Sequence, residues 1–267
     1  MVAECVGLWL AEGDRKSESE ITFTNSEPYL IRFFHECLRK LLSDNDFHVY
    51  SYSKSGRAEK PCNAAYIKCY IDKRARKPYY ILRLCRTELV KKWSKIVRKI
   101  VPDKALWPHI LRGFFAGEGN IKTGKHHSRQ LRIAQGRENP SIERMLKHVG
   151  IGFRYSGAER SYVISGFWNW EIFAKYCISD LHPLKKARFW SVFRTFKQRH
   201  YKAHHIRNEL LIMLKTPATT AHLAGYFKRS MARVQEILVD LKKEGLVNTF
   251  RVGSVNYWTT KKDIVII

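Results

Sequence analysis

The sequence predicts an α+β protein made of a repeated helix–strand unit followed by a small C-terminal domain. Three observations support this fold class. A short motif occurs twice, with its two Glu residues 106 positions apart. A similar series of amphipathic helices and alternating strands follows each copy, whereas the last part of the chain has a different pattern. The expected divisions are residues 1–105, 106–200 and 204–267.

In the motif, Gly is followed by three apolar residues, a small residue, Glu and a second Gly. The first copy occupies residues 7–13 (Gly-Leu-Trp-Leu-Ala-Glu-Gly) and the second residues 113–119 (Gly-Phe-Phe-Ala-Gly-Glu-Gly). A short apolar run that ends in Gly is typical of a helix that stops there. Each copy is therefore predicted to form a short helix.

After the first motif, alternation and helix-start residues predict one helix flanked by strands. The Asn-Ser-Glu-Pro segment at 25–28 is a helix-start signal. The predicted strands are 20–24, 47–53, 64–71 and 79–85, and the helices are 29–42 and 88–100.

The second motif is followed by a similar series, in which Asn139 and Pro140 supply the helix start. The predicted strands are 130–134, 153–155 and 161–165, and the helices are 141–149, 168–176 and 185–196. We interpret both halves as one αββαββα unit.

Composition limits the class of function. The 267 residues include 49 Lys and Arg against 24 Asp and Glu, for a net charge of +25, and 45% are hydrophobic. Such a chain buries a core, and a basic folded chain most often binds nucleic acid. The six Cys include no C-x-x-C pair, and neither a membrane span nor a secretion signal is visible, so we expect an intracellular protein.

The positive charge is spread over the folded segments. Net charge is −4 for residues 1–50, +12 for 51–110, +11 for 111–200 and +6 for 201–267. This distribution predicts a long binding surface. The alternative is a generally basic, heat-adapted surface, although ion-pair networks use both signs more equally.

Glu12 and Glu118 occupy an unfavourable position, because each lies in the last turn of a helix, where the helix dipole is negative. If the small residues of the two motifs face each other, the helices pack closely and the carboxylates converge. Converging carboxylates are typical of a Mg²⁺ site that supports phosphodiester hydrolysis. The alternative is a purely structural helix interface.

These residues resemble the LAGLIDADG homing endonucleases, in the single-chain form with two motifs. The resemblance covers about residues 5–200 and implies two pseudo-symmetric halves that form a saddle of antiparallel sheets. It implies that Glu12 and Glu118 are catalytic and bind metal, next to the carbonyls of Ala11 and Gly117. The family consensus has Asp where this chain has Glu, and Leu10 also departs from it.

The same resemblance suggests four further catalytic residues. Asn25 and Gln135 end the strands before the second helix of each half and would hold metal-bound water; helix capping is the alternative for Asn25. Lys185 and Lys99, with Arg98 as a rival to Lys99, would polarise the nucleophilic water or stabilise charge on phosphate. A simple phosphate contact is the alternative for Lys99.

The strands are predicted to contact double-stranded DNA, since the major groove admits a β-ribbon. Alternation assigns Ile67, Cys69 and Ile71 to the core. The predicted DNA contacts of the two halves are Lys54, Arg57, Tyr66, Lys68, Tyr70, Lys73, Arg74, Arg76, Lys122, Arg129, Gln130 and Arg132. Because the halves differ, we expect a monomer on a long asymmetric target, with Mg²⁺ as cofactor, Mn²⁺ as a substitute and Ca²⁺ bound without turnover.

The C-terminal segment resembles a winged helix-turn-helix. Helices are predicted at 208–215, 221–227 and 231–244 and strands at 246–252 and 255–260, after a basic linker at 197–205. The resemblance implies further DNA contacts by Lys228, Arg229, Ser230, Arg233 and Arg251. A protein-binding or dimerisation module is the alternative.

The leading hypothesis is therefore a site-specific homing endonuclease that makes a metal-dependent double-strand break. Two alternatives stay open. One is a non-catalytic LAGLIDADG-type transcription regulator, which retention of Glu12 and Glu118 disfavours. The other is an intron RNA maturase, which the basic surface permits.

Overall fold

The computed structural model describes residues 1–43, 46–124, 129–196, 201 and 204–261. Residues 1–196 form one compact unit and residues 197–267 a second, and each is described by itself. Parts of the predicted loop at 122–129 and of the linker at 197–205 lie outside the described residues.

The first half of the larger unit (residues 1–105) contains three α-helices and a four-stranded sheet. In chain order the elements are α1 (Val2–Glu12), β1 (Ile21–Asn25), α2 (Pro28–Leu42), β2 (His48–Ser53), β3 (Tyr66–Ile71), β4 (Tyr79–Leu84) and α3 (Thr87–Ile100). The strand order is β1-β4-β2-β3. One face of this sheet and the three helices enclose a core that includes Phe23, Phe34 and Trp93.

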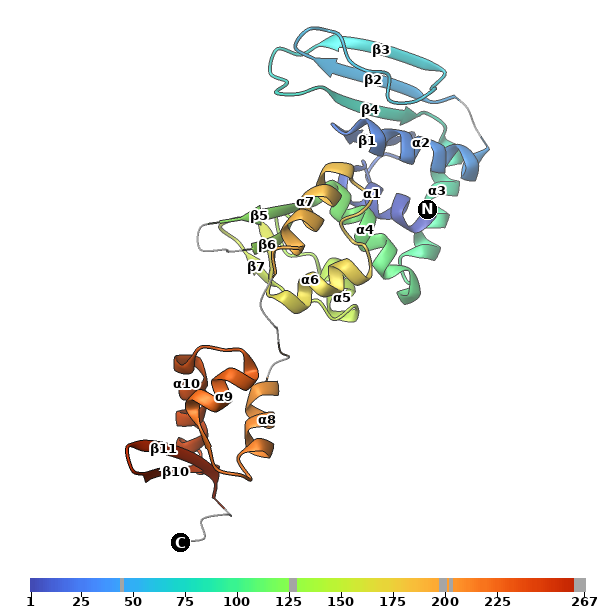
Figure 1. Cartoon of the computed structure of the whole chain (residues 1–267). Coiled ribbons are helices and arrows are strands. Elements are labelled where there is room, and N and C mark those ends of the chain that lie inside the picture. The colour runs from blue at the N-terminus through green and yellow to red at the C-terminus, as the bar shows by residue number, and fades with distance from the viewer. Residues whose placement is uncertain (44–45, 125–128, 197–200, 202–203, 262–267) are drawn as a thin grey trace. The chain divides into compact units, whose positions relative to one another are not determined.

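The second half (residues 106–196) also combines helices with a four-stranded sheet of its own. Its elements are η1 (Lys104–Leu106), α4 (Trp107–Glu118), β5 (Gly119–Thr123), β6 (Arg129–Ala134), α5 (Pro140–His148), β7 (Arg154–Ser156), β8 (Ser161–Ser165), α6 (Phe167–Lys175) and α7 (Pro183–Phe193). The strand order is β5-β6-β8-β7, antiparallel throughout. In Figure 1, α1 and α4 lie side by side between the two sheets.

The αββαββα order describes the second half, but it is wrong for the first, whose order is αβαβββα. The polar segment after the first motif (residues 14–19) forms no strand, and an isolated bridge joins Gly13, just before it, to Phe23. The first half gains β3 instead, at the opposite edge of the sheet.

The strand β3 also corrects two predictions about the first sheet. It runs parallel to β2, not antiparallel, because the twelve residues between them (54–65) allow the chain to cross back. Since β3 is an edge strand, Cys69 and Ile71 are exposed, the latter by 67%, and Ile67 is only half-buried. The core assignment is therefore wrong for Cys69 and Ile71, whereas Ile67 does pack against the core.

The smaller unit combines three helices with a three-stranded sheet. Its elements are α8 (His205–Met213), β9 (Ala218–Thr219), α9 (Thr220–Phe227), α10 (Met231–Lys243), β10 (Val247–Val252) and β11 (Val255–Thr260), and the strand order is β10-β11-β9. The hydroxyls of Thr219 and Ser230 accept hydrogen bonds from the His222 and Arg233 amides and so start α9 and α10. A separate core, with Leu223, Leu238 and Trp258, holds the unit together.

Within the described residues, every helix is too short or too polar to cross a bilayer.

Candidate metal and nucleic-acid site

The helices α1 and α4 cross at two glycines. A Cβ on Gly7 would lie 2.1 Å from the Ile110 carbonyl oxygen, and one on Gly113 would lie 2.0 Å from the Glu4 carbonyl oxygen. No real Cβ tolerates such distances, so each backbone rests directly on the other. This contact fixes how the C-terminal ends of the two helices meet.

Charged side chains also join the two helices away from the motif acids. The buried Glu4 carboxylate accepts hydrogen bonds from Arg112 Nη1 at 3.0 Å and contacts His109 Nδ1 at 3.0 Å. Arg112 also donates to the carbonyls of Tyr176 and Cys177. The crossing is therefore specified by side chains as well as by glycines.

Gly13 and Gly119, which directly follow the two motif acids, lie where a side chain would not fit. Gly13 (φ −88°, ψ 152°) and Gly119 (φ −76°, ψ 149°) are extended, so neither adopts the left-handed conformation of the usual glycine cap. A Cβ on Gly13 would lie 2.1 Å from Trp9 Cδ1, and one on Gly119 would lie 2.4 Å from the Phe115 ring. The glycines let the chain turn past an aromatic ring four residues earlier.

Glu12 and Glu118 come together at the ends of the crossed helices. Burial raises the pKa of Glu118 most, the charge of Glu12 adds to this rise and Lys185 opposes it, and together they place the pKa at about 7. Burial also raises the pKa of Glu12, although Lys185 lowers it. A carboxylate whose ionisation is disfavoured by burial and by a second carboxylate forms a site that a cation would stabilise.

Lys185, in the first turn of α7, caps the C-terminal end of α4. Its Nζ donates to the carbonyl oxygens of Phe115 at 3.1 Å, Ala116 at 2.6 Å and Gly117 at 2.7 Å. Burial lowers the pKa of Lys185 to about 8, although Glu12 and Glu118 oppose this shift. The ammonium therefore satisfies the last carbonyls of α4 and faces the two acids.

A cavity of about 340 Å³ opens beside these groups. Its lining residues are Glu12, Thr24, Asn25, Ser26, Lys77, Tyr79, Ala116, Gly117, His182 and Lys185. Residues from both halves thus share one hollow next to the acid pair.

Among the cavity residues that the sequence analysis did not assign to a site are two basic ones, Lys77 and His182. Lys77 belongs to the basic connection between β3 and β4, and His182 directly precedes α7. Burial and the charges of Lys185 and Lys77 lower the pKa of His182 to about 4, so its ring is neutral at pH 7. Its buried Nδ1 has no hydrogen-bond partner within the described residues. Proximity to Pro183 was the available sequence signal, and it indicates only a helix start.

The other predicted catalytic residues are dispersed. Asn25 lines the cavity, and its Oδ1 accepts a hydrogen bond from the Glu27 amide at 2.9 Å. Gln135 lies instead in a second cavity of about 420 Å³, together with Arg15 and Arg137. Lys99 is exposed near the end of α3 and is not among the residues that line the acid cavity.

The donor set at the acid pair suits a hard divalent cation. Two carboxylates and the Gly117 carbonyl, which also accepts a hydrogen bond from Lys185 Nζ, supply only oxygen atoms. The Cβ of Ala11 and the Glu12 side chain lie directly against Gly117, which leaves no space for a side chain there. Within the described residues, no three His, Cys, Asp or Glu side chains cluster closely enough to form a metal site by themselves.

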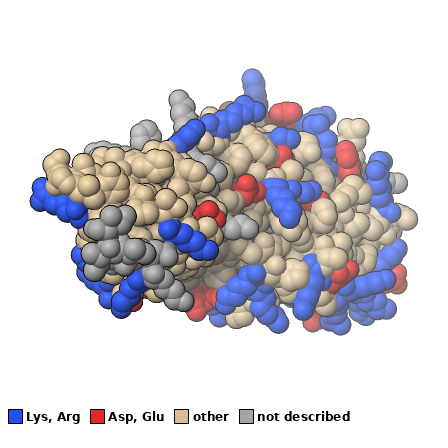
Figure 2. Space-filling model, turned by 60° about the horizontal axis from the view of Figure 1, so that its bottom comes forward, with Lys and Arg blue, Asp and Glu red and all other residues tan. Residues whose placement is uncertain are grey.

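Several predicted DNA contacts are exposed and lie on or beside the two sheets. Lys54, Arg57, Lys73, Arg74, Arg76 and Lys122 are exposed. Arg132 is committed within the protein, because it donates to Gln130 at 2.7 Å and pairs with Glu159 at 2.9 Å. Arg129 is likewise bonded to Thr195 at 2.9 Å. Figure 2 shows Lys and Arg over much of the visible surface, with fewer acidic residues between them.

In the smaller unit, Lys228 and Ser230 are exposed at the turn between α9 and α10. Arg229 lies over the Tyr201 ring at 5.5 Å, and Arg233 pairs with Glu236 at 2.7 Å. Arg251 donates to the Gly253 carbonyl at 3.1 Å. Among these basic groups, Lys228 and Arg251 are both exposed to solvent.

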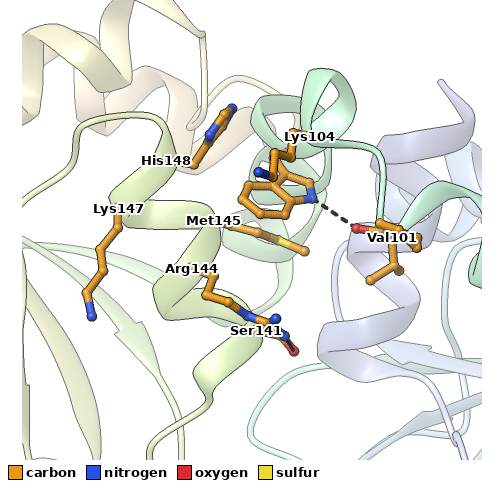
Figure 3. A pocket seen from close by; sticks show the side chains of 9 residues that line it. Val101, Lys104, Ser141, Arg144, Met145, Lys147 and His148 are labelled. Carbon is orange, nitrogen blue, oxygen red and sulfur yellow. Dashed lines mark hydrogen bonds between the residues drawn. The ribbon is translucent and has the colours of Figure 1, made fainter.

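A larger cavity of about 780 Å³ lies near the start of α4 and is shown in Figure 3. Trp107 lines it and donates from Nε1 to the Val101 carbonyl at 2.9 Å. Lys104, Arg144 and Lys147 surround it, and it contains no acid. It sits at the end of α4 opposite Glu118, so it is not part of the acid site.

Comparison with known proteins gives distant structural similarity alone. No family model and no curated protein matches the chain. A structure of I-DmoI with DNA and Mn is 15% identical, covers 67% of this chain and 96% of that one, and has a TM-score of 0.44. A complex of I-DmoI with DNA and Ca is 15% identical, covers 71% and 96%, and also scores 0.44. A mesophilic variant of the homing endonuclease I-DmoI is 14% identical, covers 68% and 97%, and scores 0.43. Similarity of this degree assigns neither an activity nor site residues to this chain.

The raised pKa of Glu118 predicts a pH-dependent stability. The folded-state pKa of about 7 exceeds the usual 4.5, so this group's contribution is fully present below pH 4.5 and is lost as pH rises through 7. His182, with its lowered pKa, contributes the opposite trend between about pH 4 and 6.5. Without metal, we therefore expect melting temperature to fall less between pH 5 and 7.5 in Glu118→Gln than in wild type. Calorimetry of both proteins measures this difference, and identical pH profiles would contradict it.

Proposed function

We propose that the protein is a LAGLIDADG-type, site-specific DNA endonuclease that makes a metal-dependent double-strand break. One observation carries this proposal. The glycine crossing of α1 and α4 brings Glu12 and Glu118 together, although both acids lie in a strongly basic protein. A protein that only bound DNA would avoid two carboxylates at the meeting point of its two sheets.

Glu12 and Glu118, with the carbonyls of Ala11 and Gly117, would hold Mg²⁺, with Mn²⁺ as a substitute and Ca²⁺ bound without turnover. When bound, such a cation supplies Lewis-acid stabilisation of the phosphate that is attacked. Lys185 neutralises the end of α4 and keeps a positive charge beside the acids. Asn25 and His182 line the cavity and would orient water there, whereas Gln135, the other residue that the resemblance suggested for this role, lines a separate cavity.

The two halves would contact one long, asymmetric duplex as a monomer. Their pseudo-symmetry is supported by the similar order of their central strands and by the paired motif helices. Because the outward side chains of the two sheets differ, each would bind a different half-site. The exposed basic residues beside the sheets would contact phosphates, which position the protein without specifying sequence.

The smaller unit would be a winged helix that adds DNA contacts. Two helices joined by a tight turn, followed by the β10–β11 hairpin, support this proposal. Lys228, Arg229, Ser230 and Arg233 would approach a groove, and Arg251 would contact DNA from the hairpin.

The proposed function is tested with a library of long duplexes. Wild-type protein is incubated with the library in Mg²⁺, Mn²⁺, Ca²⁺ or EDTA, and cut molecules are sequenced. We expect cleavage at one preferred sequence in Mg²⁺ and Mn²⁺ alone. Tight binding to one sequence without cleavage in either metal would instead establish a non-catalytic regulator.

The lysine positions give a matched pair of variants. Since Lys77 lines the acid cavity and Lys99 does not, Lys77→Met is expected to slow cleavage by about 10- to 100-fold, whereas Lys99→Met leaves the chemical step unchanged. Single-turnover cleavage at saturating protein measures this step without the effect of affinity. A larger effect of Lys99→Met would restore the assignment made from the sequence.

Removal of the smaller unit tests its proposed role. A chain truncated after residue 203 is expected to bind the selected target more weakly, with a shallower dependence of affinity on salt, because phosphate contacts are lost. Residual cleavage at high protein concentration should remain, since the acid pair lies in the larger unit. Unchanged affinity and salt dependence would contradict the winged-helix proposal.

A further inference from the structure

The C-terminal ends of the two crossed helices differ, although the motif that forms them is repeated. In α4, the carbonyl oxygens of Phe115, Ala116 and Gly117 all accept hydrogen bonds from Lys185 Nζ, at 3.1, 2.6 and 2.7 Å. Carbonyls in the last turn of a helix have no partner within the helix, and they carry partial negative charge. A single ammonium therefore binds the end of α4 through three oxygen atoms, as a small cation would.

The equivalent end of α1 has no such group. The residues of the first motif that correspond to the three capped positions are Trp9, Leu10 and Ala11. The Trp9 carbonyl accepts a hydrogen bond from the Gly13 amide at 2.9 Å. Within the part of the chain that the structure describes, no side chain donates to the carbonyl of Leu10 or Ala11. The end of α1 is thus open where the end of α4 is capped.

This difference comes from the third residue of the last helix in each half. In α7 that residue is Lys185, whereas in α3 it is Leu89, which packs against the core of the first half. An apolar side chain has no donor for a carbonyl oxygen. The asymmetry is therefore specified by the sequence.

Lys185 also acts on both motif acids. Burial raises the pKa of Glu12 and the pKa of Glu118, and the charge of Lys185 opposes both shifts. Glu12 lies against the capped end, because a Cβ on Gly117 would be 2.9 Å from Glu12 Cγ and 3.5 Å from Glu12 Oε1. The ammonium and a motif carboxylate thus meet at the same residue, Gly117.

The repeat supplies two acids and two helix ends, and these oxygen donors offer two positions for hard cations. A divalent cation on the Gly117 carbonyl would share that oxygen with the ammonium, and two cations so close repel each other. Lys185 therefore competes with a divalent cation at the end of α4. At the end of α1, the carbonyls of Leu10 and Ala11 have no such competitor among the described side chains.

We propose that the Lys185 ammonium fills one of the two cation positions that the repeat provides, so that the acid pair binds a single divalent cation. The proposal rests on the proposed function, because it requires a metal site at Glu12 and Glu118. It narrows the donor set of that site: the Gly117 carbonyl belongs to Lys185, and the two acids and the Ala11 carbonyl remain for the divalent cation.

The number of cations is counted on the full chain without DNA, so that cleavage does not enter the result. Mn²⁺ is titrated into the protein at pH 7, and the free ion is measured by electron paramagnetic resonance. We expect one Mn²⁺ per chain for the wild type and two for Lys185→Met. Lys186→Met, which makes the same change at an exposed neighbour, should bind one. The Glu12→Gln/Glu118→Gln double variant should bind none, and it reports any ions bound elsewhere.

A second variant separates the charge of Lys185 from its role as a cap. Lys185→Met leaves the carbonyls of α4 without a donor, so its fold is checked by circular dichroism. Lys185→Gln keeps an uncharged donor at this position, and it too should bind two Mn²⁺.

Each outcome has a distinct meaning. Two Mn²⁺ on the wild type would overturn the proposal, whether or not the variants fold. One Mn²⁺ on the wild type and on a folded Lys185→Met or Lys185→Gln would also overturn it, since the count would not depend on the ammonium. No Mn²⁺ on any of these proteins, or an equal count in the double acid variant, would instead overturn the metal site of the proposed function.

Discussion

Glu12→Gln and Glu118→Gln are each expected to reduce strand cleavage by about a thousandfold or more while leaving duplex affinity intact. Each carboxylate faces the other across the α1–α4 crossing, and Gln keeps its size while removing its charge. Glu12→Gln should also lower the pKa of Glu118, because the charge of Glu12 contributes to the raised pKa of Glu118. Single-turnover cleavage of the selected duplex in Mn²⁺, with binding measured in EDTA, checks both expectations.

The matched control for these variants is Glu88→Gln, an exposed acid in the first turn of α3. It removes the same charge from the same half without altering the cavity. Equal losses in all three variants would indicate a general charge effect, and full activity in Glu12→Gln would eliminate the two-acid site.

Gly113→Ala is expected to destabilise the larger unit by more than about 3 kcal/mol, because its methyl group would meet backbone atoms that cannot move aside. The new Cβ would lie 2.0 Å from the Glu4 carbonyl oxygen and 2.9 Å from the Leu8 nitrogen. Gly7→Ala should act in the same direction through the Ile110 carbonyl. Guanidinium unfolding followed by tryptophan fluorescence measures this loss, since six of the seven tryptophans lie in residues 1–196.

Gly157→Ala is the appropriate control, because a Cβ there would meet nothing within 4 Å. It should leave the unfolding midpoint of the larger unit nearly unchanged. A midpoint for Gly113→Ala close to that of Gly157→Ala would mean that the helices cross with more space than the structure describes. Cleavage should fall with stability in Gly113→Ala, since the same contact sets the approach of the two acids.

The sequence predicted the elements that have strong local signals. Helix starts such as Asn139-Pro140 and Ser230 lie where hydrogen bonding was expected, and β11 spans the predicted residues 255–260. The parallel β2–β3 pair was not predictable in this way, because alternation specifies which side chains share a face but not the direction of a neighbouring strand. The same limit explains the exposed Cys69 and Ile71, whose apolar character favoured the core.

For the candidate site, the repeat indicated the acids, and Lys185 followed from the resemblance. The sequence did not predict Lys77 and His182 as site residues, because only the fold brings their segments, which are far apart in the chain, to the cavity. Lys99 was assigned from the resemblance, and no residue of α3 is among those that line the cavity. The basic connection before β4 had been interpreted only as a phosphate contact.

The Glu4–Arg112 pair has a consequence for chimeric proteins. It joins a buried carboxylate of one half to a guanidinium of the other, and Arg112 in turn holds two carbonyls of its own half. An unpaired buried charge is strongly unfavourable. A recombinant chain that takes its halves from different parents therefore needs compatible residues at both positions. Exchange of one half without its counterpart would yield a chain that fails to assemble before any question of target arises.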